Sequence, residues 1–394
     1  MVFPERFASL PEYAFPRLRR LLDAHAPGGD PVAMTIGEPQ HAFPDWIADD
    51  LADAMRLFNK YPPNEGSDAL RTAITNWVGL RYGVTLDPAT EVMALNGTRE
   101  GLFNAMLALC PETKNGARPL VAVPNPFYQV YAVAAQAVGA EVLYMNATAD
   151  TGFLPDYSAL EAATLDRIAV AYLCSPSNPQ GAVADRAYWE ALITLAERHD
   201  FRIFADECYS EIYRGETGPT GALEVAAAIG ATPGRVVIFH SLSKRSNMPG
   251  LRSGFVATDA ASIAQIKQLR SYAGAPLPGP LQAVATKVWS DEAHVVENRR
   301  LYAEKFEIAD EVLGQVPGYV SPEAGFFLWL PVEDGEAAAL RLWQETGVRV
   351  LPGAYLGRDT DTGNPGHGFI RVALVAPTDD VRRGLTRIAA CLYS

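Results

Sequence analysis

One short stretch of this 394-residue chain combines a lysine, two serines and an arginine in a spacing suited to covalent chemistry beside a phosphate. It runs Ser241-Leu-Ser243-Lys244, and Gly250, Arg252 and Gly254 follow. A lysine amine can form a Schiff base with an aldehyde, while hydroxyls and a guanidinium bind phosphate oxygens. A serine-rich surface loop with solvated charges has the same composition, so the interpretation depends on whether the chain contains other parts of such a site.

Further polar motifs follow apolar runs elsewhere. Asn96-Gly97-Thr98 opens a helical pattern, and the N–H groups at a helix N-terminus bind anions, although an ordinary capped turn has the same sequence. Tyr128, in Pro124-Asn-Pro-Phe-Tyr128, could stack on a flat ring or belong to the core, and Phe127 and Tyr131 compete with it for that role. Asn178, in Ser175-Pro-Ser-Asn178-Pro-Gln-Gly181, could donate to a phenolic oxygen.

Two charged residues lie in or next to apolar runs, so each would need an oppositely charged partner if it were buried. Asp206, in Asp206-Glu-Cys-Tyr209, ends an apolar run, and a buried carboxylate requires a cation such as a protonated pyridine nitrogen. Arg371 lies inside the apolar run 369–374 and suits bidentate binding of a carboxylate. A solvated loop aspartate and a surface arginine on an edge strand are the alternatives.

The elements that must position these residues follow an α/β pattern. Several runs are apolar at consecutive positions, which is typical of strands buried on both faces of a mainly parallel sheet. Helical patterns alternate with them: Ser67 and Asp68 can cap one helix and Thr98 opens another. The expected strands are 92–95, 120–123, 141–145, 168–173, 202–205, 236–239 and 254–257, with further helices at 186–199 and 260–272. This predicts a doubly wound lobe with ligands at the carboxyl ends of its strands.

The pattern changes after the proline-rich segment 276–280. A helical run over 281–313 precedes expected strands at 325–330 and 369–374 and helices near 335–346 and 378–392. We therefore predict three parts. Residues 1–44 form an arm and part of a small domain, residues 45–285 a large cofactor-binding domain, and residues 286–394 a small α+β domain. The first 40 or so residues lack strong periodicity, so the arm is expected to pack on a partner or on the small domain.

Composition excludes several classes of protein. A net charge of −13 and a pI near 5.0 disfavour a nucleic-acid surface. No stretch of 18 apolar residues predicts a membrane span, and the N-terminus resembles no secretion signal. The 4 cysteines lack paired spacing, so Cys174 and Cys208 are expected to be small core residues in a reducing cytoplasm. No metal site is predicted.

Together these residues resemble the class I/II aminotransferases, the aspartate aminotransferase-like members of the fold-type I pyridoxal-phosphate family. The resemblance extends from Ile36-Gly-Glu-Pro39 to Arg371, with the motifs in the same order and spacing. Within the family, Ile36-Gly-Glu-Pro-Gln-His-Ala-Phe-Pro44 and Asn96-Gly-Thr-Arg-Glu100 look most like the succinyldiaminopimelate aminotransferases of lysine biosynthesis. The resemblance implies a seven-stranded, mainly parallel sheet in a large lobe, with a smaller α+β domain.

The resemblance also implies a role for each site residue. Lys244 would form the Schiff base with pyridoxal phosphate and move the Cα proton, and Asp206 would pair with the pyridine nitrogen. Asn178 and Tyr209 would contact the phenolic oxygen, and Tyr128 would stack on the ring. The phosphate would be bound by Gly97, Thr98, Ser241, Ser243 and Arg252.

The substrate and the partner subunit complete the implied site. Arg371 would bind the substrate α-carboxylate, helped by Asn178 and the Gly37 backbone. Tyr61, in Lys60-Tyr-Pro-Pro-Asn-Glu-Gly66, matches a family tyrosine that reaches the phosphate of the neighbouring subunit, which implies a homodimer with shared sites.

The choice of substrate rests on Arg99. A basic residue here binds the distal carboxylate of a dicarboxylic substrate in some relatives, which favours glutamate with 2-oxoglutarate as one pair and succinyldiaminopimelate as the other, in a ping-pong cycle. A surface or dimer-face arginine is the alternative, and aspartate, alanine and aromatic amino acids remain open as substrates. The candidates for the substrate entrance are Tyr13, Phe15, Arg17, Arg19 and Arg20.

Two other classes of protein share the same motifs. A C–S β-lyase on this fold would use the same lysine, aspartate and arginine, so the motifs separate it poorly. A non-catalytic regulator that senses pyridoxal phosphate would carry an added DNA-binding region. The first 40 residues are too short for one, and the net charge of −13 disfavours it.

Overall fold

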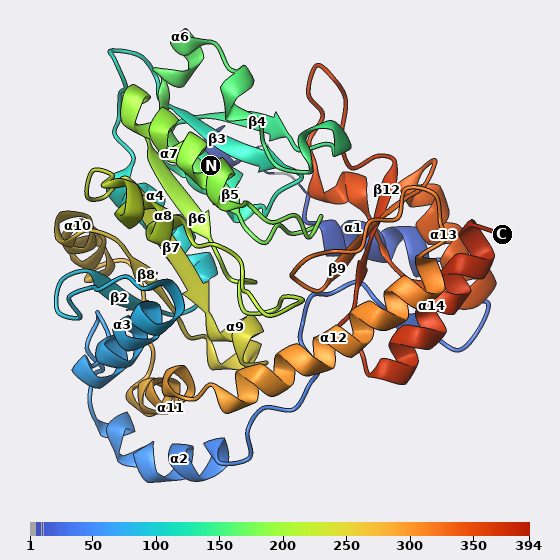
Figure 1. Cartoon of the computed structure of the whole chain (residues 1–394), viewed down its shortest axis with the longest axis horizontal. Coiled ribbons are helices and arrows are strands. Elements are labelled where there is room, and N and C mark those ends of the chain that lie inside the picture. The colour runs from blue at the N-terminus through green and yellow to red at the C-terminus, as the bar shows by residue number, and fades with distance from the viewer. Residues whose placement is uncertain (1–4, 9, 11) are drawn as a thin grey trace.

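A seven-stranded sheet forms the centre of the larger lobe (Figure 1). The computed structural model describes residues 5–8, 10 and 12–394, so parts of the predicted arm (1–4, 9 and 11) lie outside the described residues. The strand order is β2-β8-β7-β6-β5-β3-β4, and β8 alone pairs antiparallel, with both β2 and β7. The strands are β2 Val92–Leu95, β3 Leu120–Asn125, β4 Glu141–Asn146, β5 Ile168–Cys174, β6 Arg202–Asp206, β7 Val236–Ser241 and β8 Gly254–Ala257. The predicted fold class and each predicted strand are confirmed.

Helices cover both faces of this sheet and create two separate cores. Alternate residues of one strand enter different cores: Ile238 packs with Trp77 and Trp189, whereas Val237 packs with Leu102 and Ile266. Burial on both faces therefore explains the consecutive apolar residues. The helices of the first face include α3 Asp68–Tyr82, α7 Arg186–His199, α8 Ala222–Ile229 and α11 Gly279–Ser290, and those of the second include α4 Thr98–Leu109, α5 Val130–Ala137 and α10 Ala260–Arg270.

Side-chain caps fix where several of these helices begin. Ser67 Oγ accepts a hydrogen bond from Leu70 N at 3.2 Å, as predicted for α3. Asp185 caps α7 in the same way, accepting from Tyr188 N at 2.8 Å. Each bond satisfies a backbone N–H that has no partner within the helix.

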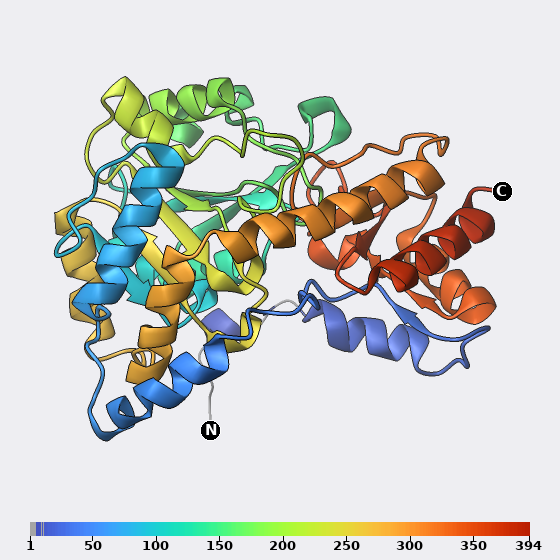
Figure 2. The same cartoon turned by 60° about the horizontal axis from the view of Figure 1, so that its bottom comes forward.

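A smaller lobe contains a three-stranded antiparallel sheet in the order β11-β12-β9. The 21-residue helix α12, Ala293–Leu313, extends from the larger lobe into the smaller one (Figure 2). A short parallel pair joins the N-terminal segment to this lobe, β1 Val32–Ala33 with β10 Val348–Arg349. Its other elements are β9 Phe327–Pro331, β11 Leu351–Pro352, β12 Phe369–Ala373, α13 Gly335–Thr346 and α14 Thr378–Leu392. The predicted domain boundaries at 44/45 and 285/286 stay a prediction.

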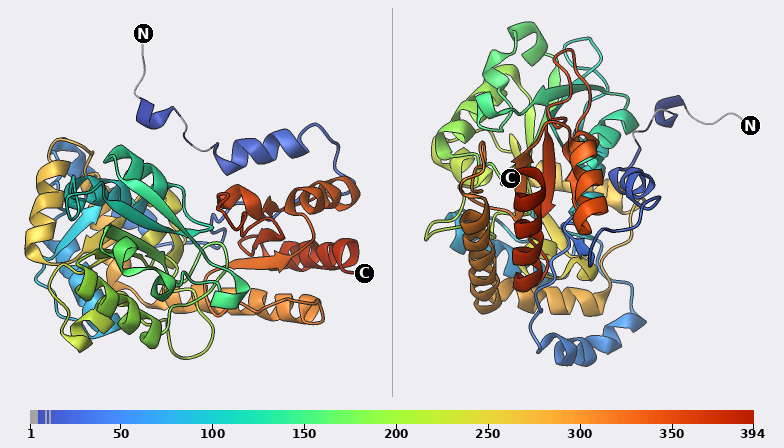
Figure 3. Two further views of the ribbon diagram at one scale, coloured as in Figure 1. Left: turned by 90° about the horizontal axis from the view of Figure 1, so that it is seen from above. Right: turned by 90° about the vertical axis from the view of Figure 1, so that its right-hand side faces the viewer.

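Two sequence-based expectations about helices are wrong. The predicted run over 281–313 is two helices, because extended backbone at Asp291 ends α11 and the Asp291 carboxylate accepts from His294 N at the start of α12. The N-terminal segment does contain an amphipathic helix, α1 Ala14–Leu22, which lies beside α13 (Figure 3). Its buried Ala14, Leu18 and Leu22 belong to one apolar cluster with Trp343 of α13. The buried apolar residues recur every four positions and are separated by arginines. The apolar stripe is therefore narrow, and its periodicity is weak in the sequence.

None of the helices in the described part is both long and apolar enough to cross a membrane.

Short helices complete the described part of the chain. The short α-helices are α2 Ile47–Ala54, α6 Ala162–Leu165 and α9 Leu242–Arg245, and the 3-10 helices are η1 Glu5–Phe7, η2 Met55–Asn59, η3 Ala149–Thr151, η4 Tyr157–Ala159, η5 Pro249–Leu251 and η6 Gly353–Leu356.

Candidate active site

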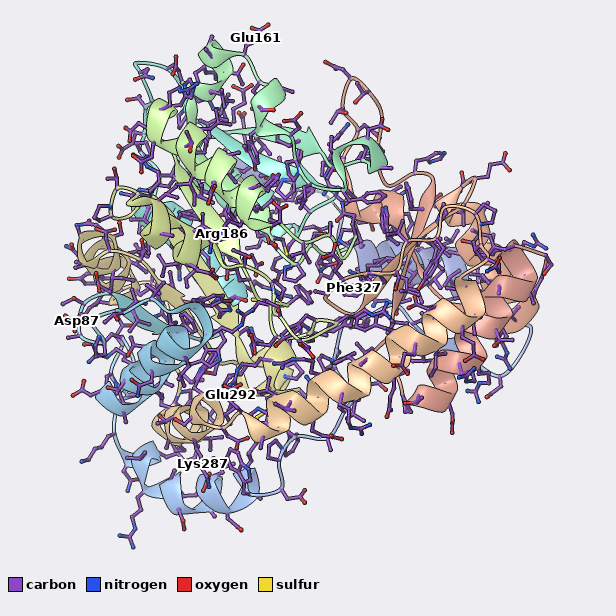
Figure 4. All side chains as sticks on the ribbon, viewed as in Figure 1. Asp87, Glu161, Arg186, Lys287, Glu292 and Phe327 are labelled. Atoms are coloured by element: carbon purple, nitrogen blue, oxygen red, sulfur yellow. The ribbon has the colours of Figure 1, made fainter. Side chains whose placement is uncertain are left out.

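A cavity of about 320 Å³ lies where the carboxyl ends of the parallel strands meet the smaller lobe. Asp206 ends β6 and Ser241 ends β7, and Phe327, at the start of β9, lies between the lobes (Figure 4). Nearly all of the residues predicted from the sequence line this one cavity: Gly37, Thr98, Arg99, Tyr128, Asn178, Asp206, Tyr209, Ser241, Ser243, Lys244, Arg252 and Arg371. Gly97 lies directly behind Arg252, whereas Tyr61 is fully exposed on the surface.

Lys244 presents its amine to the cavity from α9, the short helix after β7. Ser241 Oγ caps this helix, accepting from Ser243 N at 3.1 Å. Lys244 Nζ donates to the backbone oxygen of Gly37, and no carboxylate in the described part of the chain forms an ion pair with it. Burial lowers the pKa of Lys244 to about 8, which makes the neutral, nucleophilic amine accessible near neutral pH.

Gly97 and Arg252 meet at the N-terminus of α4. Gly97 has φ +84°, and a Cβ at this position would lie 2.0 Å from Arg252 Nη2. Only glycine therefore allows the guanidinium to lie against this turn. Arg252 has no carboxylate partner among the described residues, and its Nη1 donates to Pro249 O at 3.0 Å. A cation beside the N–H groups of a helix N-terminus, with the hydroxyls of Ser241, Ser243 and Thr98 in the same cavity wall, forms a site suited to a phosphate.

Asp206 lies at the floor of the cavity with 5% of its surface exposed. Its Oδ2 accepts from the Tyr131 hydroxyl at 2.7 Å and its Oδ1 from Cys208 N at 3.3 Å. Burial raises the pKa of Asp206, and these hydrogen bonds oppose the shift. No lysine or arginine pairs with it in the described structure, and nearby His240 is paired with Glu207. The solvated-loop interpretation is therefore wrong.

Arg371 lies opposite, in the central strand of the small sheet. It is 4% exposed, so the surface interpretation is also wrong. Its Nη1 donates to Asn178 Oδ1 at 2.9 Å and its Nη2 to Thr35 O at 2.6 Å, while its buried Nε has no partner. Burial lowers the pKa of Arg371 to about 10, because no described carboxylate compensates its charge. Asn178 also donates to the Tyr209 hydroxyl at 3.1 Å, so these three side chains form one network.

Arg99 and Tyr128 form the outer wall of the cavity. Arg99 Nε donates to the Tyr128 hydroxyl at 2.6 Å, and Arg99 has no carboxylate partner among the described residues. Tyr13 and Phe15 line the same cavity from the N-terminal segment, whereas Arg17, Arg19 and Arg20 are not among its lining residues; a role in the substrate entrance stays a prediction.

Sequence reasoning missed part of the cavity wall. Cys174 and Cys208 face the cavity and are not merely core residues, and Cys208 Sγ lies 3.2 Å from Thr98 Oγ1. Tyr131 was considered only as a competitor of Tyr128 for ring stacking, whereas it binds Asp206. The available signal was the spacing of three between the two tyrosines: Tyr128 lies in the turn before α5, Tyr131 N donates to Tyr128 O at 3.0 Å, and the two rings are in contact.

The residues present fit pyridoxal phosphate. The cavity offers the Arg252 guanidinium for a phosphate and the Lys244 amine, whose pKa is lowered, for an aldehyde. A buried carboxylate without a cation, Asp206, suits a protonated ring nitrogen. The close approach that only Gly97 permits completes the anion site. These are the complements of the groups that the cofactor carries.

Comparisons with known proteins agree with this fit. The sequence model for a family described as "Aminotransferase class I and II" matches residues 30–388. An LL-diaminopimelate aminotransferase of Syntrophobacter fumaroxidans is 33% identical over 98% of this chain and 97% of its own. The corresponding enzyme of Dehalococcoides mccartyi is 31% identical over 99% and 98%.

Solved structures give the same result. An aminotransferase from Neisseria meningitidis superimposes with a TM-score of 0.93 at 38% identity, covering 98% of this chain and 99% of that one. The aminotransferase AspB from Helicobacter pylori gives 0.88 at 33% identity, covering 99% of both chains.

Replacing Gly97 should weaken phosphate binding. Gly97→Ala forces the Arg252 guanidinium away and strains a backbone conformation that glycine favours, so we expect the dissociation constant for pyridoxal phosphate, measured by equilibrium dialysis, to rise at least about tenfold. Gly116→Ala is the control, because Gly116 also has positive φ but faces open space. Equal cofactor affinity in the two variants would contradict the predicted phosphate site.

Replacing Lys244 should abolish covalent attachment of the cofactor. Lys244→Ala should bind pyridoxal phosphate without the absorbance band of the lysine-bound form and lose turnover by a factor on the order of a thousand. Lys287→Ala, which changes an exposed lysine on α11 (Figure 4), should retain both properties.

The pH dependence of attachment should reveal the lowered pKa of Lys244. In wild-type apoenzyme, attachment should accelerate as the pH rises through about 8, because the neutral amine is then formed. An acceleration seen only near the pKa of a free lysine amine, about 10.4, would contradict the burial argument.

Proposed function

The chain belongs to the class I and II aminotransferases, which depend on pyridoxal phosphate, and we propose that it transfers the amino group of a dicarboxylic amino acid to a 2-oxo acid. We further propose glutamate and 2-oxoglutarate as one substrate pair and a diaminopimelate, free or succinylated, as the other amino donor. The observation that carries this proposal is Arg99, a cation in the cavity wall without a carboxylate partner among the described residues.

The proposed catalytic roles follow from the contacts in the cavity. When bound, pyridoxal phosphate supplies an aldehyde that takes up the amino group and a ring that withdraws electrons from the substrate Cα. Lys244 Nζ accepts the Cα proton and returns it after transfer, a role that its lowered pKa supports. Asp206 holds a proton on the ring nitrogen, since its buried carboxylate has no other cation. Asn178 and Tyr209 orient the phenolic oxygen, and Tyr128 covers the ring.

Phosphate anchoring is proposed for the residues around α4 and α9. Arg252 supplies the charge, and the N-terminus of α4 supplies backbone N–H groups. The hydroxyls of Thr98, Ser241 and Ser243 complete the set. A fixed phosphate would keep the ring at one distance from Lys244 and Asp206 throughout the reaction.

Two arginines from different lobes would orient the substrate. Arg371 binds the α-carboxylate and exchanges its present carbonyl partner, Thr35 O, for a full charge. Arg99 binds the distal carboxylate while remaining hydrogen-bonded to Tyr128. The names of the relatives support a diaminopimelate, since that diamino acid carries a carboxylate at each end. The proposed contact of the Gly37 backbone with the α-carboxylate would come from the Gly37 N–H, because Gly37 O can only accept and already accepts from Lys244 Nζ.

A homodimer with shared sites is proposed from Tyr61. This side chain has a relative exposure of 102%, and Met55, Phe58 and Tyr272 are also exposed. Exposed apolar groups of this size are favourable when a partner covers them. In such a dimer, Tyr61 of each subunit would reach the cofactor phosphate bound by the other subunit.

A cytoplasmic location also remains a prediction.

Substrate preference should depend on Arg99. Holoenzyme is mixed with glutamate, LL-diaminopimelate, its N-succinyl derivative or alanine, while loss of the lysine-bound absorbance band is followed. In Arg99→Leu the half-saturating concentration of each dicarboxylic donor should rise about 10- to 100-fold, since a charged hydrogen bond is lost. The half-saturating concentration of alanine, which has no distal carboxylate, should stay within about threefold of its wild-type value.

Matched variants sharpen this test. Arg99→Lys keeps a charge and should recover part of the preference, while Arg198→Leu changes an exposed arginine at the end of α7 and should change nothing. Equal effects of Arg99→Leu on glutamate and alanine would contradict the proposed substrate class. Pyruvate and ammonia released from cystathionine without a 2-oxo acid would favour a C–S β-lyase instead.

Hybrid dimers should reveal whether Tyr61 acts across subunits. Tyr61→Ala and Lys244→Ala each leave inactive homodimers in this scheme, but a mixed dimer contains one intact site. Refolding or coexpressing equal amounts should therefore restore about a quarter of wild-type activity. If Tyr61 served its own subunit, or were unimportant, mixing would restore nothing beyond the sum of the separate variants.

A further inference from the structure

Tyr131 contacts the buried carboxylate of the site from the far side of the cavity floor. It lies on α5 and its side chain is fully buried. Its hydroxyl donates to Asp206 Oδ2 at 2.7 Å, whereas Cys208 N donates to the other carboxylate oxygen at 3.3 Å, and the Cys208 thiol also hydrogen-bonds this carboxylate. Tyr131 therefore makes the shortest hydrogen bond recorded to Asp206.

The aromatic surroundings leave this hydroxyl one orientation. The Tyr131 ring stacks on Tyr172, with centroids 4.4 Å apart and planes 13° from parallel. Tyr172 is itself fixed, because its hydroxyl donates to Leu102 O at 2.9 Å. Tyr128 also contacts Tyr131 edge-on, with ring centroids 5.7 Å apart. One tyrosine thus touches both the residue proposed to cover the cofactor ring and the residue proposed to bind its nitrogen.

The charges around this contact favour one direction of proton donation. Burial, reinforced by the Asp206 charge, raises the pKa of Tyr131 well above its usual value, so the phenol keeps its proton. Burial also raises the pKa of Asp206, and hydrogen bonds from Cys208 and from Tyr131 oppose that rise. Tyr131 is accordingly the donor, and the ionised carboxylate is the form that it stabilises.

We propose that Tyr131 is a positioning residue that holds Asp206 ionised and oriented toward the ring nitrogen of the cofactor, and so sets how strongly the ring withdraws electrons from the substrate. The proposal rests on the role proposed for Asp206. It assigns to a tyrosine a function that ring stacking and core packing do not require, because both would be served equally by phenylalanine.

Tyr131→Phe removes only the hydroxyl and retains the stacked ring. We expect kcat to fall about 10- to 100-fold with KM within about threefold, since a hydrogen bond to a charged group is lost. The dissociation constant of apoenzyme for pyridoxal phosphate should rise by a similar factor. NMR of cofactor labelled at its ring nitrogen should show a smaller protonated fraction in the variant.

Tyr172→Phe is the matched control. It removes a buried hydroxyl from the neighbouring ring of the same stack, but that hydroxyl bonds to Leu102 O and not to Asp206. It should lower the melting temperature by about as much as Tyr131→Phe, while the cofactor affinity and the ring-nitrogen signal stay at wild-type values. If Tyr131→Phe changes these two properties no more than Tyr172→Phe does, the proposal is overturned.

A double-mutant cycle with Asp206→Asn tests the role proposed for Tyr131 separately from the role proposed for Asp206. If Tyr131 acts through the carboxylate, Tyr131→Phe should have little further effect on cofactor affinity in the Asp206→Asn background. An undiminished effect there would assign Tyr131 a purely structural role. Wild-type cofactor affinity and turnover in Asp206→Asn alone would instead refute the role proposed for Asp206, a result distinguishable from failure at Tyr131.

Discussion

Charges removed from water without an opposite charge beside them are unfavourable, and the cavity between the two lobes is built around several of them. Lys244, Asp206 and Arg371 are all desolvated, and none forms an ion pair with another described residue. Their pKa values shift in the directions that burial dictates. In the proposed function, the Asp206 carboxylate would pair with the cationic ring of the cofactor and Arg371 with an anionic substrate, while the Lys244 amine would bond to the aldehyde.

The sheet makes this arrangement possible by supplying rigid strand ends. In the register of the sheet, Gly254 of the antiparallel strand β8 lies opposite both Leu95 and Ser241. The turn after β2 and the start of α9 are thereby held on either side of one glycine. A Cβ on Gly254 would lie 2.6 Å from His240 O, so the spacing between these two anion-binding turns depends on its absence. The second lobe then adds Arg371 from a strand that has neighbours on both sides.

The sequence predicted what depends on local pattern and missed what depends on distant contacts. Strands such as β7 were identified because residues like Val237 and Ile238 fill opposite cores, and the motifs at their ends follow from chain order. The hydrogen bond from Tyr131 to Asp206 joins residues 75 positions apart, and no local pattern distinguishes that tyrosine from a core residue. The helix break at Asp291 contains neither glycine nor proline, so two periodic helices resembled one. Arg99 was named correctly as part of the wall, yet its substrate cannot be derived from its type.

The N-terminal segment satisfies the cavity cations until other partners replace it. Thr35 O accepts from Arg371 and Gly37 O accepts from Lys244, two carbonyls from one extended stretch. This stretch lies close against the small sheet, since a Cβ on Gly37 would lie 2.5 Å from the Phe327 ring. A carbonyl dipole stabilises a buried cation less than a full negative charge does. Binding of a carboxylate at Arg371, the role proposed for this residue, would therefore exchange a weaker partner for a stronger one.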